Sequence, residues 1–117
     1  DQQDDRIERH AQTEQDFADM AAAYAAVAPH PERFDDLPGR SMTSLNGWTG
    51  WTDEELAGIT ARVLIVVGDH DFTTTAHAAV MHELIPGSQL AILPGTTHMQ
   101  APRRADLLVP ILTAFLD

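Results

Sequence analysis

The sequence predicts an α/β domain built on parallel strands, and three observations support this class. A continuous aliphatic run, Val63–Val67, ends at Gly68. A second segment that fits a strand, Gln89–Leu93, follows downstream, and a helical pattern follows each strand. Uninterrupted aliphatic runs are typical of strands buried on both faces of a parallel sheet. The order strand, helix, strand, helix corresponds to a right-handed parallel unit.

The part of the chain before these strands is predicted to be helical and loop-like. From Asp4 to Ala28, large apolar residues recur at helical spacing. We expect the following stretch to be irregular, because Pro31 and Pro38-Gly39 interrupt it and Asn46-Gly47 favours a turn. We therefore divide the chain into a helical segment, residues 1–50, and an α/β segment, residues 51–117.

Helix signals place the remaining elements. Thr52–Glu55 is a capping box that predicts a short helix, with Leu56 and Ile59 facing inward. The threonines at 73–75 offer N-caps for a helix through about Leu84. A last helix is expected over about Pro102–Leu116, with one apolar face and a kink at Pro110.

Composition excludes several classes of function. The formal net charge is −11, and all seven basic residues are arginines, so nucleic acid and anionic membranes are poor partners. There is no cysteine, which excludes disulfides and thiol nucleophiles. No apolar run is long enough for a membrane span and no signal-peptide core is present, so we expect a cytoplasmic protein. Because the chain begins at Asp1 without an initiator methionine, we expect it to be trimmed or part of a longer product.

Polar side chains follow both predicted strands. Asp69, His70 and Asp71 follow the first strand, and His98 follows the second. Functional groups of open α/β sheets gather in the loops after the carboxyl ends of strands. Because adjacent strands lie about 4.8 Å apart, we expect Asp71 to reach His98. Asp69 and His70 are interpreted as structural members of a polar turn.

These motifs resemble the end of an α/β-hydrolase. The matching pattern begins with an apolar strand, G-x-x-D over Gly68–Asp71 and a helix. It continues with I-P-G, a strand, P-G-x-x-H over residues 94–98 and a closing helix. The resemblance implies a catalytic triad whose acid is Asp71 and whose general-base histidine is His98. It also implies that residues before Gly47 belong to a lid, that no metal or organic cofactor is needed, and that the substrate is a small molecule with an ester or similar acyl bond.

The nucleophile of that family has no counterpart in the sequence. No G-x-S-x-G is present, and Ser41, Ser44 and Ser88 lack the strand–elbow–helix context. We therefore interpret the chain as the acid–histidine half of a serine-type hydrolase, inactive when isolated. The expected partner is the N-terminal half of the same hydrolase or a second copy of this chain.

Other interpretations remain open at this stage. One alternative is a catalytically inactive, hydrolase-derived interaction or dimerisation module. Another is a metal site formed by Asp69, Asp71 and His98. His77 and His82 lie five residues apart and so on different helix faces, which disfavours a shared metal. Trp48 and Trp51 are interpreted as packing residues.

Overall fold

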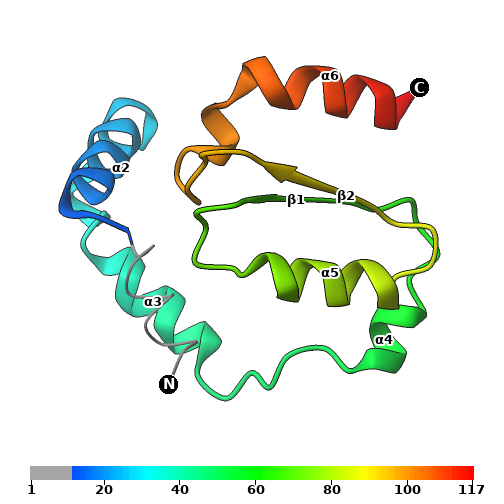
Figure 1. Ribbon diagram of the computed structural model, residues 1–117. Helices are drawn as coiled ribbons and strands as arrows, with labels where there is room; N and C mark the ends of the chain where they lie inside the picture. Colours follow the sequence, from blue (N-terminus) through cyan, green and yellow to red (C-terminus); the bar gives the residue numbers. More distant parts are fainter. Residues whose placement is uncertain (1–11) are drawn as a thin grey trace. The chain divides into compact units, whose positions relative to one another are not determined.

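A computed structural model describes residues 12–117, which divide into two compact units. We call Gln12–Trp51 the helical unit and Thr52–Asp117 the sheet unit. The helical unit contains α2 (Glu14–Val27), the 3₁₀ turn η1 (Pro31–Arg33) and α3 (Asp36–Leu45) (Figure 1). The sheet unit contains α4 (Asp53–Ala57), β1 (Leu64–Gly68), α5 (Thr75–Leu84), β2 (Gln89–Leu93), the 3₁₀ turn η2 (Ala101–Arg103) and α6 (Ala105–Leu116).

Helix α2 begins at a capping box. The Thr13 hydroxyl accepts a hydrogen bond from the Asp16 amide at 3.2 Å, and the Asp16 carboxylate accepts one from the Thr13 amide at 2.9 Å. These bonds satisfy amides that have no partner within the helix. The first residues of the helix expected over Asp4–Ala28 lie outside the described residues. Tyr24 of α2 packs against Phe34, which follows η1, with 5.6 Å between the ring centroids.

The expectation of an irregular segment around Pro38-Gly39 was wrong. These residues lie inside α3, which begins at Asp36. Pro38 is the third residue of the helix, where a backbone N–H has no intrahelical acceptor to lose. The proline signal therefore marks the first turn of a helix at this position.

The sheet unit is a two-stranded parallel sheet between two helices. β1 and β2 pair in parallel, with Leu64 opposite Gln89 and Gly68 opposite Leu93. Helix α5 connects the strands and lies on one side of them, and α6 lies on the other (Figure 1). The buried apolar residues of this unit are Val67, Ala78, Ile85 and Leu93.

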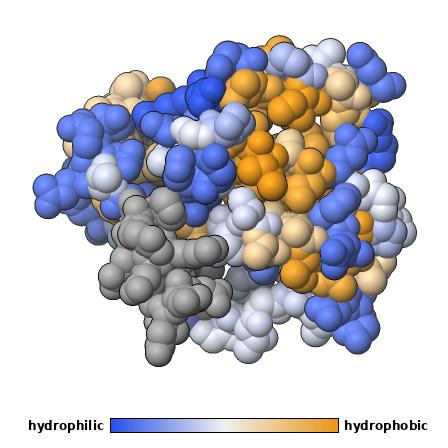
Figure 2. All heavy atoms as spheres, in the orientation of Figure 1, coloured by the Kyte–Doolittle hydropathy of each residue, from blue (hydrophilic) through white to orange (hydrophobic). Residues whose placement is uncertain are grey.

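Burial of β1 is less complete than its aliphatic sequence predicted. Val67 and Gly68 are buried, whereas residues 64–66 are only partly buried. The sheet has two strands in the described residues, which is too narrow to enclose a strand from both faces. Figure 2 shows apolar atoms at the surface over α6 and the strands. The exposed residues of this unit include Ile92, Val109 and Leu112.

Local signals placed the other elements within a few residues. The Thr52 capping box starts α4, Thr74 caps α5, and β2 covers the residues expected of it. The last helix starts at Ala105 rather than near Pro102, because Arg104 has a non-helical backbone (φ −84°, ψ 61°) that separates η2 from α6. No helix in residues 12–117 is both long enough and apolar enough to cross a bilayer.

Candidate active site

The loop after β1 holds Asp71 in a fixed orientation. The Asp71 amide donates to the Gly68 carbonyl at 3.2 Å, which closes a turn directly after the strand. The Asp71 carboxylate accepts a hydrogen bond from the Thr73 amide at 2.9 Å. Its side chain is only 5% exposed. An aspartate that bonds the backbone two residues ahead forms an Asx-turn, so local sequence orients this carboxylate before any distant contact is made.

The loop after β2 brings His98 onto that carboxylate. His98 Nδ1 lies 3.1 Å from both Asp71 Oδ1 and Asp71 Oδ2. The Phe72 ring packs against the imidazole, with 4.3 Å between centroids. A carboxylate can only accept hydrogen bonds, so Nδ1 must carry a proton and the neutral ring keeps Nε2 as its acceptor nitrogen. The structure thus brings together the two side chains that the sequence predicted to meet, and their catalytic role stays a prediction.

A pocket of about 370 Å³ lies beside this pair. Its lining is mostly apolar, and its polar groups are those of Asp71, Thr73 and His98. The apolar lining residues are Val66, Val67, Met99, Ala101 and Pro102. The His98 side chain is 46% exposed, so a reactant can reach the imidazole. Few convergent polar groups in an apolar pocket are typical of a small-molecule site.

Asp69 binds the backbone of the second loop. Its Oδ1 accepts a hydrogen bond from the Thr96 amide at 3.1 Å and lies 3.3 Å from His70 Nδ1. Hydrogen bonds from the backbone of Gly95 and then of Thr96 hold the pKa of the Asp69 carboxyl below its usual value, with a smaller contribution from His70. The interpretation of Asp69 as a structural residue therefore agrees with its contacts.

Thr96 is a site residue that sequence reasoning missed. It is fully buried, and its amide, carbonyl and hydroxyl all form hydrogen bonds. Its hydroxyl accepts from Arg104 Nη1 at 3.0 Å. Nothing in the P-G-T-T sequence distinguishes this threonine from one exposed in a turn, because its burial depends on the approach of the β1 loop.

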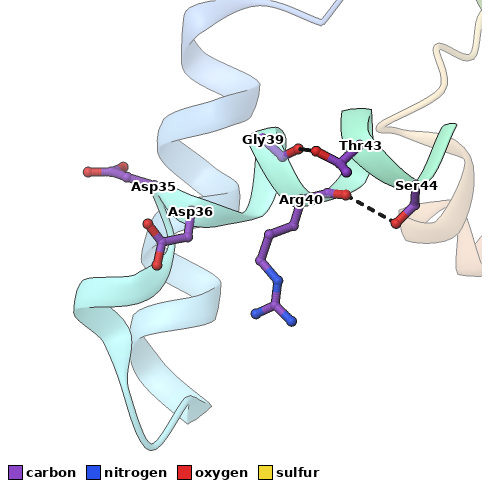
Figure 3. A pocket seen from close by; sticks show the side chains of 6 residues that line it. All are labelled: Asp35, Asp36, Gly39, Arg40, Thr43 and Ser44. Atoms are coloured by element: carbon purple, nitrogen blue, oxygen red, sulfur yellow. Dashed lines mark hydrogen bonds between the residues drawn. The ribbon is translucent and has the colours of Figure 1, made fainter. Parts of the chain in front are cut away.

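The serines have other partners or lie within a helix. The Ser88 hydroxyl donates to the His82 carbonyl at 3.0 Å and lies 2.9 Å from His82 Nδ1. Ser88 directly precedes β2, whereas His98 follows the other end of that strand. In α3, the Ser44 hydroxyl donates to the Arg40 carbonyl one turn earlier, beside an open depression (Figure 3). Ser41 also lies within α3. None of the three occupies a strand–helix elbow.

The remaining candidates show no sign of a metal centre. Within residues 12–117, no three histidine, aspartate or glutamate side chains are grouped as a metal site would require. Asp69, one of the proposed ligands, is instead bonded to the Thr96 amide.

Trp48 and Trp51 pack edge to face at 6.1 Å between centroids, and both stay largely exposed.

Comparison with known proteins relates part of the chain to a peptidase. No family model matches the sequence. A similar protein is a proline iminopeptidase of Saccharolobus solfataricus, which is 34% identical over 64 residues. The match covers 55% of this chain and 21% of that protein, so the chain spans about a fifth of the relative's length. The mixed helix–strand fold with a small parallel sheet is compatible with an α/β protein.

Proposed function

We propose that the sheet unit is the acid- and histidine-bearing part of a serine-type α/β-hydrolase that acts on an ester or similar acyl substrate. The observation that carries this proposal is the contact of His98 Nδ1 with both Asp71 oxygens, at 3.1 Å each. The partial similarity to a proline iminopeptidase, a member of the α/β-hydrolase family, supports it.

The proposed chemistry divides between the two residues. Asp71 orients the imidazole and stabilises the imidazolium that forms during the reaction. His98 Nε2 takes the proton from a serine hydroxyl as that oxygen attacks the acyl carbon. It then returns the proton to the leaving group as the carbon–heteroatom bond breaks. The exposure of the His98 side chain supports this role, because Nε2 must be reachable by the nucleophile.

The serine and the oxyanion-hole donors are proposed to come from a part of the hydrolase outside these residues. Ser88 is buried, and its hydroxyl already donates to the His82 carbonyl, so it is a poor nucleophile for this site. The 117-residue chain alone is therefore expected to be inactive. The segment of residues 1–50 is proposed to belong to the lid of the same hydrolase.

A fluorophosphonate probe tests this proposal, because it labels only an activated serine. The isolated chain should stay unlabelled. The natural polypeptide that contains these residues, captured with an antibody raised against them, should be labelled on one serine. His98→Ala in that polypeptide should abolish labelling, whereas His77→Ala, on the exposed side of α5, should not. Absence of labelling of the natural polypeptide would contradict the assignment as a serine hydrolase.

A specific observation also supports the alternative, an interaction or dimerisation module. In the described residues, β1 and β2 pair only with each other, so each strand has an outer edge with unpaired backbone groups. Such edges favour pairing with another strand. A second copy of this chain, or a serine-bearing chain, could supply that additional strand. Light scattering over a dilution series tests self-association, and a monomer at micromolar concentration with cooperative unfolding would contradict pairing of two copies.

A further inference from the structure

The two loops of the candidate site are joined at Thr96, two residues before His98. A Cβ added to Gly68 would lie 1.9 Å from the Thr96 carbonyl oxygen, so the loops approach as closely as backbones can. The His70 amide donates to that carbonyl at 3.1 Å, and the Asp69 carboxylate accepts from the Thr96 amide at 3.1 Å. Both backbone groups of Thr96 are thus bound by the loop that carries Asp71.

The hydroxyl of Thr96 extends this connection to the last helix. Its Oγ1 donates to the Pro94 carbonyl at 2.9 Å and accepts from Arg104 Nη1 at 3.0 Å. Arg104 is itself held by Asp106, with Nε–Oδ1 at 3.1 Å and Nη2–Oδ2 at 3.2 Å. The Asp106 hydrogen bond raises the pKa of Arg104, so the guanidinium stays charged. The Thr96 hydroxyl is therefore bonded to a guanidinium that Asp106 holds in place.

His98 itself lies within a hydrogen-bonded turn that runs from Thr97 to Ala101. The Thr97 amide donates to the Gln100 side chain at 3.0 Å, and the Thr97 carbonyl accepts from the amides of Gln100 and Ala101. His98 is thus held inside a closed turn, two residues after the buried Thr96. Small displacements of a catalytic group reduce rates strongly, and supporting contacts therefore matter as much as the group itself.

We propose that Asp69 and Arg104 are positioning residues that act through Thr96 to hold His98 Nδ1 on the Asp71 carboxylate. This inference rests on the proposed function, since it assigns a supporting role within the same site. Neither residue touches the imidazole in the described contacts. Asp69 joins the second loop to the Asp71 loop, and Arg104 joins it to the start of α6.

The tautomer of His98 reports on this positioning without any catalysis. While Asp71 holds Nδ1, the neutral imidazole carries its proton there. Two-bond ¹H–¹⁵N spectra of the full 117-residue chain, in mildly alkaline buffer, distinguish protonated from unprotonated ring nitrogens. The chain has six histidines, and His98→Gln identifies the relevant signals. Asp71→Ala gives the spectrum of an imidazole that has lost the acceptor of its Nδ1 proton.

Asp69→Ala and Arg104→Gln are the main variants, because both side chains are partly exposed, at 39% and 34%. We expect the ratio of Nδ1–H to Nε2–H tautomer of His98 to fall about twofold or more in each, since a net hydrogen bond biases an equilibrium by at least that factor. Asp69→Asn keeps an acceptor oxygen and should restore part of the ratio. Arg103→Gln removes the same charge from an exposed neighbour and should leave it unchanged.

The hydroxyl of Thr96 gives an independent pair of variants. Thr96→Val keeps the shape but removes the acceptor of Arg104, and should shift the tautomer ratio in the same direction. Thr96→Ser keeps the hydroxyl and should retain the wild-type ratio. Thermal unfolding measured in parallel separates positioning from stability, because a merely structural role lowers the midpoint without changing the tautomer of folded molecules.

The outcomes separate the two proposals. An unchanged His98 spectrum in Asp71→Ala, which removes both acceptor oxygens, shows that the acid–histidine contact itself is absent and overturns the proposed function. A changed spectrum in Asp71→Ala, with wild-type spectra in Asp69→Ala and Arg104→Gln, overturns the positioning role alone. If Thr96→Val does not fold, the two variants at the partly exposed positions still decide the result.

Discussion

Replacing Gly68 by alanine tests whether the two site loops touch through their backbones. The added Cβ would lie 1.9 Å from the Thr96 oxygen and 2.7 Å from the Thr96 carbonyl carbon. Ordinary contacts begin at 3.4 Å, so the loops must separate by about 1.5 Å. Backbone atoms cannot rotate away as a side chain can, and overpacking of this kind costs about 3 kcal/mol.

That separation also breaks hydrogen bonds between the loops. The Asp69 amide donates to the Leu93 carbonyl at 3.0 Å, and the His70 amide donates to the Thr96 carbonyl at 3.1 Å. Each bond is worth about 1 kcal/mol net. We therefore expect Gly68→Ala to lower the free energy of unfolding by about 3–5 kcal/mol. At about 4–8 °C per kcal/mol for a small domain, the midpoint should fall by about 12 °C or more.

Urea and thermal unfolding of the 117-residue chain measure this loss. Gly58→Ala is the matched control within the same unit, because a Cβ there meets no atom closer than 3.3 Å and the backbone is right-handed helical. The control should change stability by no more than about 1 kcal/mol. A Gly68→Ala chain as stable as the control, with an unchanged His98 spectrum, would refute the close approach of the loops.

The remaining predictions concern acid stability, a cap and the end of the chain. The pKa of the Asp69 carboxyl is lowered in the folded chain, so its contribution to stability is complete above the ordinary value of 3.8 and is lost as the pH falls through the lowered value. In Asp69→Asn, the free energy of unfolding in urea should therefore fall less steeply over that acid range. An unchanged pH profile would contradict the Asp69–Thr96 bond. Thr52→Ala removes the hydroxyl that accepts from the Glu55 amide at 3.2 Å and should cost about 1 kcal/mol, measured by urea unfolding; Thr60→Ala, at an exposed position outside the helices, is the control. Arg62 donates to the Phe115 carbonyl and lies 4.8 Å from the Phe115 ring centroid. Arg62→Ala should therefore speed amide exchange in the last turn of α6 and lower the free energy of unfolding by about 1 kcal/mol. Unchanged exchange there would show that α6 is held by its apolar contacts alone.

Several features of the fold could be predicted because they depend on local sequence. The capping boxes at Thr13 and Thr52 fix helix starts through bonds that span three residues, and the second is among the predictions made above from the sequence. The aliphatic run that ends at Gly68 predicts β1, and the Pro-Gly that follows Leu93 predicts the end of β2. Where local signals compete, prediction failed. Pro38 was interpreted as a breaker, although a proline in the first turn of α3 loses no hydrogen bond.

The acid–histidine contact could also be expected from the sequence. Asp71 and His98 each follow a strand directly, and parallel pairing places the carboxyl ends of both strands at the same edge. The contact of Nδ1 with both carboxylate oxygens at 3.1 Å is an observation of the structure, in which an Asx-turn to the Thr73 amide orients Asp71. The catalytic role of the pair depends on a nucleophile, and it stays a prediction.

By itself, the sequence determined the main elements of the sheet unit, their order and the two loops that carry Asp71 and His98, but not α3. Turn chemistry, capping and aliphatic runs act over a few residues, so they can be recognised without a fold. Only the tertiary structure showed that Thr96 is fully buried and that Asp69 and Arg104 converge on it. These contacts join residues that are distant in the chain, and they form only when β1 and β2 align in register. The partial burial of β1 was likewise decided by the width of the sheet, which no property of the strand's own sequence encodes.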